Sequence, residues 1–494
     1  MRALLATSIG VAAAGALLLS LAPTEFADSP TSRQPTPAAD LAHAAPAAAR
    51  ARTDARTGDR ASGADRARHS DGDRARRLPG RTQSLPLGKP ADRSRSGGRL
   101  LSAWQNDPSG GRRITTRHVR PFSLLGVVWN DVREQPRARL QMQTRDARTG
   151  RWTGWRPLNT RDDDRPDPDG RAHAQPGARG ATAPVWVGGS DAVRVRVQAP
   201  KPHRGGADEG RKRPAEPQLP AGTRLELVDP GPDHPGSSGH PRPQQDTERT
   251  KNGRAEDPEQ RPGGVLPALD KAETRARYGG AAAGQGGAGQ SADHIGPRPA
   301  IVTRKGWGAD ESLRQGDYLY TDSVKAAFVH HSAESNNYSC SQSPAIVRGI
   351  YRYHVLSSKW RDIGYNFLVD KCGKIYEGRA GGVAKPVMGA HTFGFNNDTT
   401  GIAVLGTYSR TRPSKAALHA LARLTAWKLG VHGVAANAKV SLVSGGGTKY
   451  RKGTRVSFNS ISGHRDGYVT DCPGDGIYDR LGSVRTAAAR LQGR

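Results

Sequence analysis

The chain has 494 residues, of which only 35% are hydrophobic and 5% aromatic, alongside 61 glycines and 35 prolines. This composition excludes one continuous folded body, because long Arg-, Ala-, Gly- and Pro-rich tracts cannot bury enough apolar surface to offset the loss of chain entropy. The formal net charge of +29 suits an anionic partner. We expect no nucleic acid as that partner, since no folded segment interleaves aromatic and basic residues.

Residues 1–27 have the features of an export signal. A basic start is followed by an apolar run from Ala3 to about Ala22, then by Pro and small or polar residues. The run is close to the length of a membrane span, so a retained anchor is the alternative, and the cleavage position stays open. We therefore expect a secreted or cell-wall-associated protein, in which a disulfide can persist.

Residues 28–113 form a basic segment with almost no large apolar residue and no sequence period. We interpret this segment as disordered. In an exported chain its arginines could attract anionic cell-wall polymers or lipid head groups through an unspecific, salt-sensitive field. The alternative is that the arginines only solvate a disordered tail.

Residues 114–229 differ in sequence pattern from the segment before them and predict a small all-β sandwich-like module. Short apolar or alternating runs such as "FSLLGVVW", "ARLQMQTR" and "AVRVRVQ" are bounded by Gly, Pro and Asp. The module also contains four tryptophans, which either form a carbohydrate-stacking platform or pack in the core and its rim: Trp129, Trp152, Trp155 and Trp186. Residues 230–297 are predicted to be a Pro- and Gly-rich linker.

Residues 298–494 alternate strand and helix signals and predict a mixed α/β domain, with a central mixed β-sheet flanked by helices. The runs "AAFVHHSA", "YNFLVD", "KIYEGR" and "GIAVLGTY" are typical of buried strands. Ser343 and Pro344 predict a helix start, a second helix is expected from Pro413 to Leu429 with its end at Gly430, and a third near residues 480–491. We expect this multidomain chain to be a monomer.

The three cysteines of the chain divide into a pair and a single residue. Cys340 opens a helical segment and Cys372 lies in the turn "DKCGKI" between two predicted strands, so we interpret the two as a disulfide. This interpretation leaves Cys472 over, and an odd cysteine in an exported protein suggests a partner or a role.

Cys472 is a candidate zinc ligand together with His464 and His330. A thiolate and two imidazoles would leave one tetrahedral position open, as in catalytic rather than structural zinc sites. The spacing of His464 and Cys472 fits no standard zinc motif, so a surface position for either residue stays open on spacing alone.

Five motifs in order strengthen the zinc hypothesis. The segments "IVTRKGWGADES", "AFVHHSA", "RDIGYNFLVDKCGKIYEGR", "GAHTFGFNNDTTGIAVLG" and "SGHRDGYVTDCPGD" together resemble the zinc-dependent N-acetylmuramoyl-L-alanine amidase and peptidoglycan-recognition protein family. The match runs from about residue 298 to 478. The β module and linker resemble exported actinobacterial members.

The resemblance implies a Zn²⁺ ion held by His330, His464 and Cys472, with His331 left out as a neighbour on the opposite strand face. It implies a catalytic role for Tyr365, whose hydroxyl would stabilise the attacking water or the developing oxyanion. The sequence has Thr470 where phage-type relatives have lysine, and we assign Thr470 only a supporting hydrogen bond. His391 matches a substrate-groove histidine of the family, and a satisfied loop histidine is the alternative. Arg379, Asn396 and Asn397 are further candidates for contacts to the glycan or peptide, with turn chemistry for the asparagines and strand-end solvation for the arginine as the alternative.

The resemblance also implies the reaction and the alternative to it. The expected substrate is bacterial peptidoglycan, cleaved at the amide between the lactyl group of N-acetylmuramic acid and L-alanine. A bound zinc ion would lower the pKa of water to about 7 and polarise the scissile carbonyl. The alternative is a protein that binds peptidoglycan without cutting it. Such members often lack the cysteine ligand, so Cys472 together with Tyr365 favours catalysis.

Overall fold

The computed structural model describes residues 80–87, 104–108, 111–116, 119–160, 165–167, 177–200, 216–232, 264–284, 292–332 and 335–494. Residues Gly72–Arg494 make up one compact unit. The predicted export signal and most of the predicted basic segment lie outside the described residues. Within the described ranges, none of the helices combines the length and hydropathy needed to cross a bilayer.

The N-terminal module is all-β, as the sequence predicts. Its strands are β1 (Arg81–Pro86), β2 (Gln105–Asn106), β3 (Arg112–Thr116), β4 (Phe122–Trp129), β5 (Arg139–Asp146), β6 (Arg156–Leu158), β7 (Gly180–Ala181), β8 (Val185–Gln198) and β9 (Arg224–Asp229). The long strand β8 connects two groups of strands. Its first half pairs with β4, and its second half pairs with β3 and β5. The pair Gly188 and Gly189 lies between these halves, and Gly188 has the positive φ of 71° that glycine tolerates best.

The module begins earlier than the sequence predicts. Strand β1 lies within the segment 28–113 that we predicted to be disordered, and it pairs along its whole length with β9 in antiparallel register. The segment "RTQSLP" places only Leu85 in the core. Because one buried side chain gives no readable alternation, β1 is ordered by its partner strand rather than by its own sequence.

The four tryptophans of the module divide between the two explanations offered for them. Trp129 and Trp186 are buried in the core, which confirms the packing alternative for these two. Trp152 and Trp155 are half-buried, and the guanidinium groups of Arg194 and Arg196 each lie 3.9 Å from one of their ring centroids. These two rings therefore form cation–π pairs within the module.

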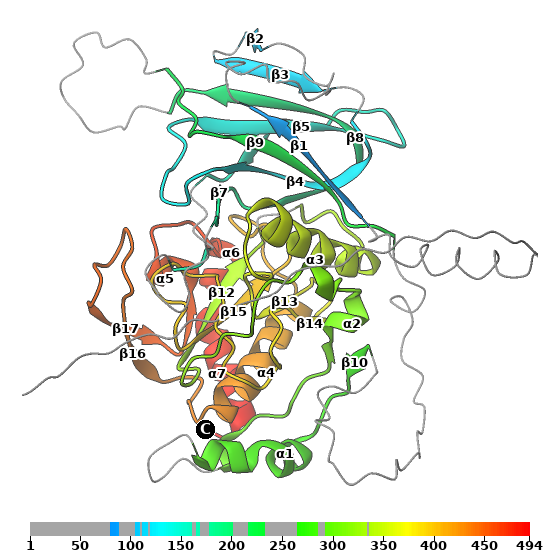
Figure 1. Ribbon diagram of the computed structural model, residues 1–494. Helices are drawn as coiled ribbons and strands as arrows, with labels where there is room; N and C mark the ends of the chain where they lie inside the picture. The colour runs from blue at the N-terminus through cyan, green and yellow to red at the C-terminus, as the bar shows by residue number, and fades with distance from the viewer. Residues whose placement is uncertain are drawn as a thin grey trace, which may run out of the picture. The chain divides into compact units, whose positions relative to one another are not determined.

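The C-terminal domain is a mixed α/β domain, as predicted (Figure 1). Its central sheet has the order β10-β11-β14-β13-β15-β12-β18, with parallel and antiparallel neighbours. The strands are β10 (Val265–Leu266), β11 (Ile301–Val302), β12 (Ala326–His331), β13 (Phe367–Val369), β14 (Ile375–Glu377), β15 (Thr399–Val404) and β18 (Ile461–Gly463). A separate hairpin consists of β16 (Lys439–Val443) and β17 (Arg455–Asn459).

The main helices are α1 (Lys271–Gly284), α3 (Ser343–Arg352), α4 (Lys415–Val431) and α7 (Leu481–Gln492). The short ones are α2 (Arg304–Trp307), α5 (His464–Gly467) and α6 (Asp475–Tyr478), with 3₁₀ turns at Ala292–His294, Glu311–Leu313 and Cys340–Gln342 and a π-turn at Tyr353–Ser357. Two predicted helix ends shift: Gln342 rather than Ser343 precedes α3, and α4 continues past Gly430 to Val431. Leu429 and Gly430 are buried in that last turn, so tertiary packing overrides the glycine stop.

The predicted linker 230–297 contains structure. Helix α1 and strand β10 both lie in it, and Tyr278 of α1 packs edge-on against Trp427 of α4 with ring centroids 5.7 Å apart. Asp270 and Glu273 accept hydrogen bonds from each other's backbone N–H groups, as in a capping box. The composition of the Ala- and Gly-rich sequence after this capping signal favours a linker. Packing against α4 nevertheless stabilises a helix there.

The two faces of the central sheet pack against different helices. Val329, Ile402 and Val404 contact the layer formed by α4 and α7, which lie side by side (Figure 1). Ala403 and Leu405 point the other way, into a cluster with α3. Since side chains alternate along a strand, His330 of β12 faces away from α4, on the same side as Phe328.

The β module and the α/β domain share part of this second cluster. Leu124, Trp186 and Val228 of the module pack with Ile346 and Ile350 of α3. At its edge the hydroxyl of Tyr353 donates to the carbonyls of Val127 and Thr182, and Ser357 donates to buried Glu226 at 3.2 Å. The module is therefore packed against the α/β domain through an apolar contact with polar edges.

Candidate metal centre

Three side chains predicted to bind zinc converge in the α/β domain. The ligand atoms of His330, His464 and Cys472 all lie within 4.8 Å of one another, and all three side chains are buried. The Cys472 sulfur lies 3.8 Å from Nδ1 of His330, and the two imidazole centroids are 4.5 Å apart. The residues form the only cluster of three His, Cys, Asp or Glu groups with this proximity among the described residues.

Strand pairing explains why these distant residues meet. Strands β12 and β18 are parallel neighbours, with Val329 opposite Gly463. The next residue along the chain is a histidine in both cases, His330 within β12 and His464 at the start of α5, so the two lie at the same end of the sheet. Cys472 is then brought back by the loop after α5, where its carbonyl accepts a hydrogen bond from Arg465 N at 2.9 Å.

The local electrostatics suit a metal cation. Burial lowers the pKa of His330 to about 3 and holds the pKa of His464 well below its usual value. Both imidazoles are therefore neutral at neutral pH, which leaves a ring nitrogen lone pair for coordination. Tetrahedral zinc with two nitrogen ligands and one sulfur ligand requires separations of about 3.5 Å, so the observed set fits Zn²⁺ after a small contraction.

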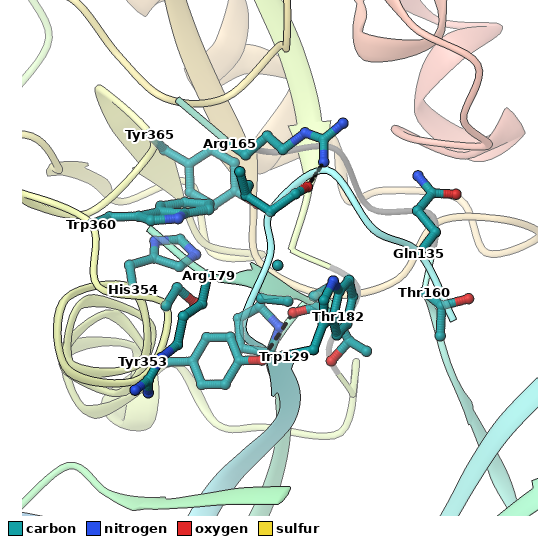
Figure 2. Close-up of a pocket in the computed structure, with 16 residues that line it drawn as sticks. Trp129, Gln135, Thr160, Arg165, Arg179, Thr182, Tyr353, His354, Trp360 and Tyr365 are labelled. Atoms are coloured by element: carbon teal, nitrogen blue, oxygen red, sulfur yellow. Dashed lines mark hydrogen bonds between the residues drawn. The ribbon is translucent and has the colours of Figure 1, made fainter. Parts of the chain in front are cut away.

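Tyr365 lies beside this cluster. Its ring centroid is 5.5 Å from that of His330, and its side chain is 2% exposed. Figure 2 shows Tyr365 with Trp360 and His354, which stack with centroids 4.4 Å apart. Nδ1 of His354 accepts a hydrogen bond from Gly364 N, next to Tyr365 in the chain. The ring of Tyr365 therefore lies near two imidazoles, with its centroid 5.9 Å from that of His354.

The loop His391–Asn396 covers another side of the cluster. His391 is fully buried, with its ring centroid 5.3 Å from that of His330. Oγ1 of Thr392 lies 3.4 Å from Nε2 of His330 and 3.1 Å from Nδ1 of His391. Sequence reasoning did not identify Thr392, although its place directly after His391 in "GAHTFGFN" was a usable signal.

Asn396 and Asn397, both predicted to contact substrate, have different environments. The buried amide oxygen of Asn396 accepts hydrogen bonds from the backbone N–H groups of His391 and Thr392, so Asn396 fixes the loop. Asn397 is exposed to solvent.

Thr470 contacts the backbone of the cysteine rather than the metal cluster. Its Oγ1 accepts a hydrogen bond from Cys472 N at 3.2 Å. His331, left out of the ligand set, is buried on the other side of β12, where its Nδ1 accepts a hydrogen bond from Tyr408 N at 3.3 Å.

Arg379 is buried, and its guanidinium donates to the carbonyls of Ile363 and Met388. Burial lowers its pKa to about 10. This environment is neither the substrate contact nor the solvated strand end considered from the sequence. Arg379 instead holds the segment before Tyr365 against the segment before His391.

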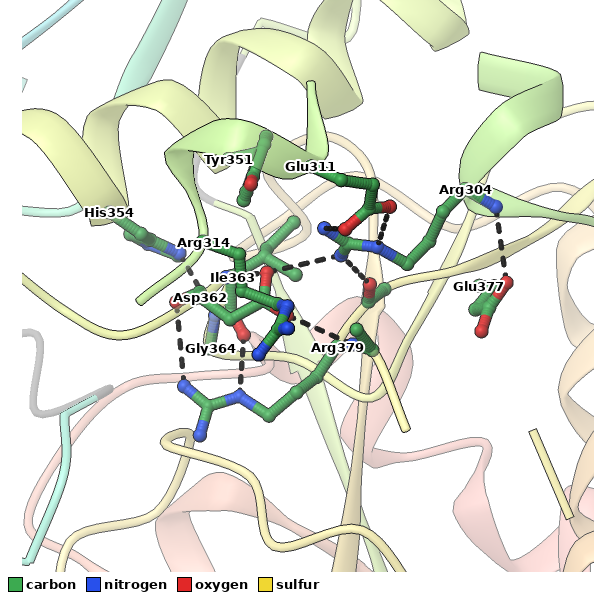
Figure 3. A network of polar contacts seen from close by, with 12 residues as sticks. Arg304, Glu311, Arg314, Tyr351, His354, Asp362, Ile363, Gly364, Glu377 and Arg379 are labelled. Atoms are coloured by element: carbon green, nitrogen blue, oxygen red, sulfur yellow. Dashed lines mark hydrogen bonds and ion pairs between the residues drawn. The ribbon is translucent and has the colours of Figure 1, made fainter. Parts of the chain in front are cut away.

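An ion-pair network around the buried side chain of Arg304 supports the same region (Figure 3). Nη1 of Arg304 lies 3.1 Å from Asp362 Oδ1, and its Nε lies 2.7 Å from Glu311. Although burial opposes the charged form, the two carboxylates hold the pKa of Arg304 above its usual value. Asp362 also accepts hydrogen bonds from Ile363 N and Ala380 N, so this carboxylate organises the turn that leads to Tyr365.

Two family profiles match the chain. The family described as N-acetylmuramoyl-L-alanine amidase matches residues 320–475, which include all three clustered ligands. The family described as Rv3811 N-terminal galactose-binding domain-like matches residues 75–221, which include β1.

Several named proteins are similar to the α/β domain. Peptidoglycan-recognition protein SC2 of Drosophila simulans is 32% identical over 186 residues, covering 37% of this chain and 84% of that protein. Human N-acetylmuramoyl-L-alanine amidase is 31% identical over 185 residues, covering 37% of this chain and 28% of that protein. The crystal structure of Drosophila peptidoglycan recognition protein SD is 25% identical with a TM-score of 0.29, covering 37% of this chain and 92% of that one.

Proposed function

Because the chain belongs to the N-acetylmuramoyl-L-alanine amidase and peptidoglycan-recognition protein family, we propose that it is a secreted, zinc-dependent amidase. Its substrate is peptidoglycan, and the bond cleaved joins N-acetylmuramic acid to L-alanine. The observation that carries this proposal is the His330, His464 and Cys472 cluster with Tyr365 beside it. In this reading the basic segment 28–113 holds the protein to anionic wall polymers.

The donor set supports a catalytic rather than a structural metal site. Three protein ligands leave one tetrahedral position for water or substrate. A zinc ion held by His330, His464 and Cys472 would supply Lewis acidity and a nucleophile near neutral pH. The chain itself supplies neutral imidazoles, a buried thiol and a dry surrounding, in which polar contacts are stronger than in water.

The other residues of the site divide into two kinds. Tyr365 provides a hydroxyl for the oxyanion that develops on the scissile carbonyl, a contact made strongest in the transition state. Thr392, Thr470 and Asn396 orient the ligands and the loop around them through the hydrogen bonds described above. His391 and Asn397 are the substrate contacts of this proposal.

A second candidate function is recognition of peptidoglycan without cleavage. The proteins similar to this chain include ones named for recognition, and burial of the metal ligands is compatible with a role in binding alone. The complete ligand set favours the amidase, because binding to a glycan does not require a thiol beside two neutral imidazoles.

The test uses the full chain and purified peptidoglycan. We expect one zinc per chain by inductively coupled plasma mass spectrometry, and soluble muramoyl-free stem peptides by mass spectrometry of the products. Cys472→Ser and His464→Ala should lose both the zinc and the products. His419→Ala, at an exposed histidine on α4 outside the site, is the matched control and should retain both.

Two outcomes would contradict the proposal. Full turnover by both ligand variants would remove the metal from the mechanism. Stoichiometric zinc and tight wall binding without any new amino termini would establish the recognition function instead.

A further inference from the structure

Three residues of the β module reach the neighbourhood of the metal cluster. Arg165, Pro166 and Asp167 lie between β6 and β7 in sequence. Oδ1 of Asp167 accepts hydrogen bonds from Gly394 N at 2.5 Å and from Asn396 Nδ2 at 3.1 Å. The carbonyl of Arg165 accepts a second hydrogen bond from Asn396 Nδ2, at 3.0 Å. We call these three residues the docking segment.

The docking segment contacts the loop that touches the metal ligands. Asn396 binds the segment with its amide nitrogen and the backbone of His391 and Thr392 with its amide oxygen. Thr392 in turn lies 3.4 Å from His330. Hence the Asn396 side chain, together with Gly394 N, links a carboxylate of the β module to the loop around the cluster.

Arg165 contacts an aromatic ring of this loop and lines a cavity together with Tyr365. Its guanidinium carbon lies 4.3 Å from the ring centroid of Phe393, in the same loop. Nη1 of Arg165 donates to the carbonyl of Val132, which anchors the segment to the body of the module. Figure 2 shows Arg165 close to Tyr365, and both residues line one cavity.

The metal ligands and Tyr365 have almost no contact with solvent in this arrangement. The cavity that Arg165 and Tyr365 line does not extend to His330, His464 or Cys472. His330 and His464 have no exposed surface, and Cys472 and Tyr365 are each 2% exposed. A glycan strand with its stem peptide cannot reach these atoms in this arrangement.

We propose that Arg165–Asp167 is an autoinhibitory segment, which occupies the approach to the metal cluster and must withdraw before a muramoyl-peptide reaches Tyr365. The proposal rests on the amidase function proposed above. The apolar contact between the module and α3 is separate from this segment, so the segment withdraws while the rest of the module stays packed against the domain.

The burial of Asp167 is consistent with a contact that can be released. Its carboxylate is partly shielded from water and accepts hydrogen bonds only from an amide and a backbone N–H, with Arg165 as its charged neighbour. Exchange of these contacts for water on withdrawal restores full hydration of the carboxylate. A tightly paired salt bridge at this position would make release much harder.

Cys472 provides a direct measure of access. It is the only cysteine outside the disulfide, and its side chain is buried. In the full chain stripped of metal, the rate at which a thiol reagent labels Cys472 therefore reports how often the approach opens. We expect Asp167→Ala to label about tenfold faster or more than the unmodified chain, because two hydrogen bonds to a charged group are lost.

The controls separate docking from folding. Asp191→Ala removes a carboxylate that pairs with Arg145 within the module, and it should label at the unmodified rate. Asp167→Asn keeps an acceptor oxygen without the charge and should label no faster than the unmodified chain at neutral pH. Thermal unfolding midpoints of all variants should agree, which excludes general destabilisation as the cause.

Amidase turnover and muramoyl-peptide binding, measured on the same proteins, complete the test. Faster labelling of Asp167→Ala with higher turnover supports the segment as an inhibitor. If Asp167→Ala labels faster and binds the muramoyl-peptide more tightly, but no variant shows turnover, the docking proposal holds and the amidase function is refuted. Unchanged labelling, or faster labelling with weaker binding and lower turnover, overturns the inhibitory role.

Discussion

The side-chain amide of Asn396 donates to the carboxylate of Asp167 at 3.1 Å, and so joins the β module to the loop beside the metal ligands. Burial raises the pKa of Asp167 to about 6, although the hydrogen bonds from Gly394 and Asn396 oppose the shift. A released, hydrated carboxylate titrates near its ordinary value of 3.8. Docking is therefore coupled to protonation of this one group.

The sign of this coupling gives the first prediction. Asp167 binds its proton more tightly when the docking segment is in place than when it is released. Docking is therefore strongest below about pH 4, weakens as the pH rises to about 6, and is constant above that. Each unit of pKa difference is a tenfold factor, so the docking equilibrium falls by up to about a hundred-fold across this window.

The measurement is the rate at which Cys472 is labelled by a disulfide reagent that reacts in acid. At each pH, the rate for the unmodified chain is divided by the rate for Asp167→Asn. The neutral amide does not titrate, so the ratio cancels the ionisation of the thiol itself. We expect the ratio to rise between pH 4 and 6 and then level off. A flat ratio would show that Asp167 does not control access.

Tyr365→Phe should lower kcat by about 10²–10³-fold, the range found when one oxyanion donor is removed. Zinc content and KM should change little, because the hydroxyl acts on the transition state and the ring still packs on His330. Tyr351→Phe is the matched control, since it removes a tyrosine hydroxyl that donates to Asp310 O away from the cluster. Equal losses in the two variants would mean that Tyr365 only stabilises the fold.

Asp362→Ala should reduce the free energy of unfolding by about 3–5 kcal/mol, because it leaves the buried guanidinium of Arg304 without this carboxylate. Denaturant unfolding followed by tryptophan fluorescence measures the change. Asp293→Ala, which breaks the exposed pair with Arg275, should cost about 0–1 kcal/mol. A small effect at Asp362 would show that Glu311 alone compensates the charge.

Replacement of both Cys340 and Cys372 by alanine should lower the free energy of unfolding by about 3–4 kcal/mol, since the disulfide closes a sequence separation of 32. The bridge ties the start of α3 to the turn between β13 and β14 and contains no metal ligand. Zinc content should therefore stay at one per chain. Loss of zinc in the double variant would mean that the bridge helps to position the cluster.

The cluster itself was predictable because its chemistry is carried by residue types. Only three cysteines occur in this chain, and the motifs around His330, His464 and Cys472 resemble a known family closely enough to name the ligands. The disulfide of Cys340 and Cys372 was predictable for the same reason, and the structure confirms it. Fold class followed from strand-like apolar runs, which are a local property.

Elements that depend on a distant partner were not predictable. Strand β1 has one buried leucine and is ordered by pairing with β9. Helix α1 lies in an Ala- and Gly-rich tract whose composition does not predict a helix, and packing against α4 stabilises it. The environment of Arg379 likewise depends on carbonyls that only the folded chain brings together. Propensity and pattern report local preferences, and tertiary contacts overrode them at these positions.

The sequence by itself determined which atoms can hold a metal and which hydroxyl can assist them, because coordination and acid–base chemistry belong to residue types. Only the tertiary structure decided that Val329 lies opposite Gly463, which places two histidines side by side, and that Asp167 reaches Asn396. The reason is that both relations are set by strand register and domain packing. These are sums of many weak contacts between segments far apart in the chain, and no single stretch of sequence records them.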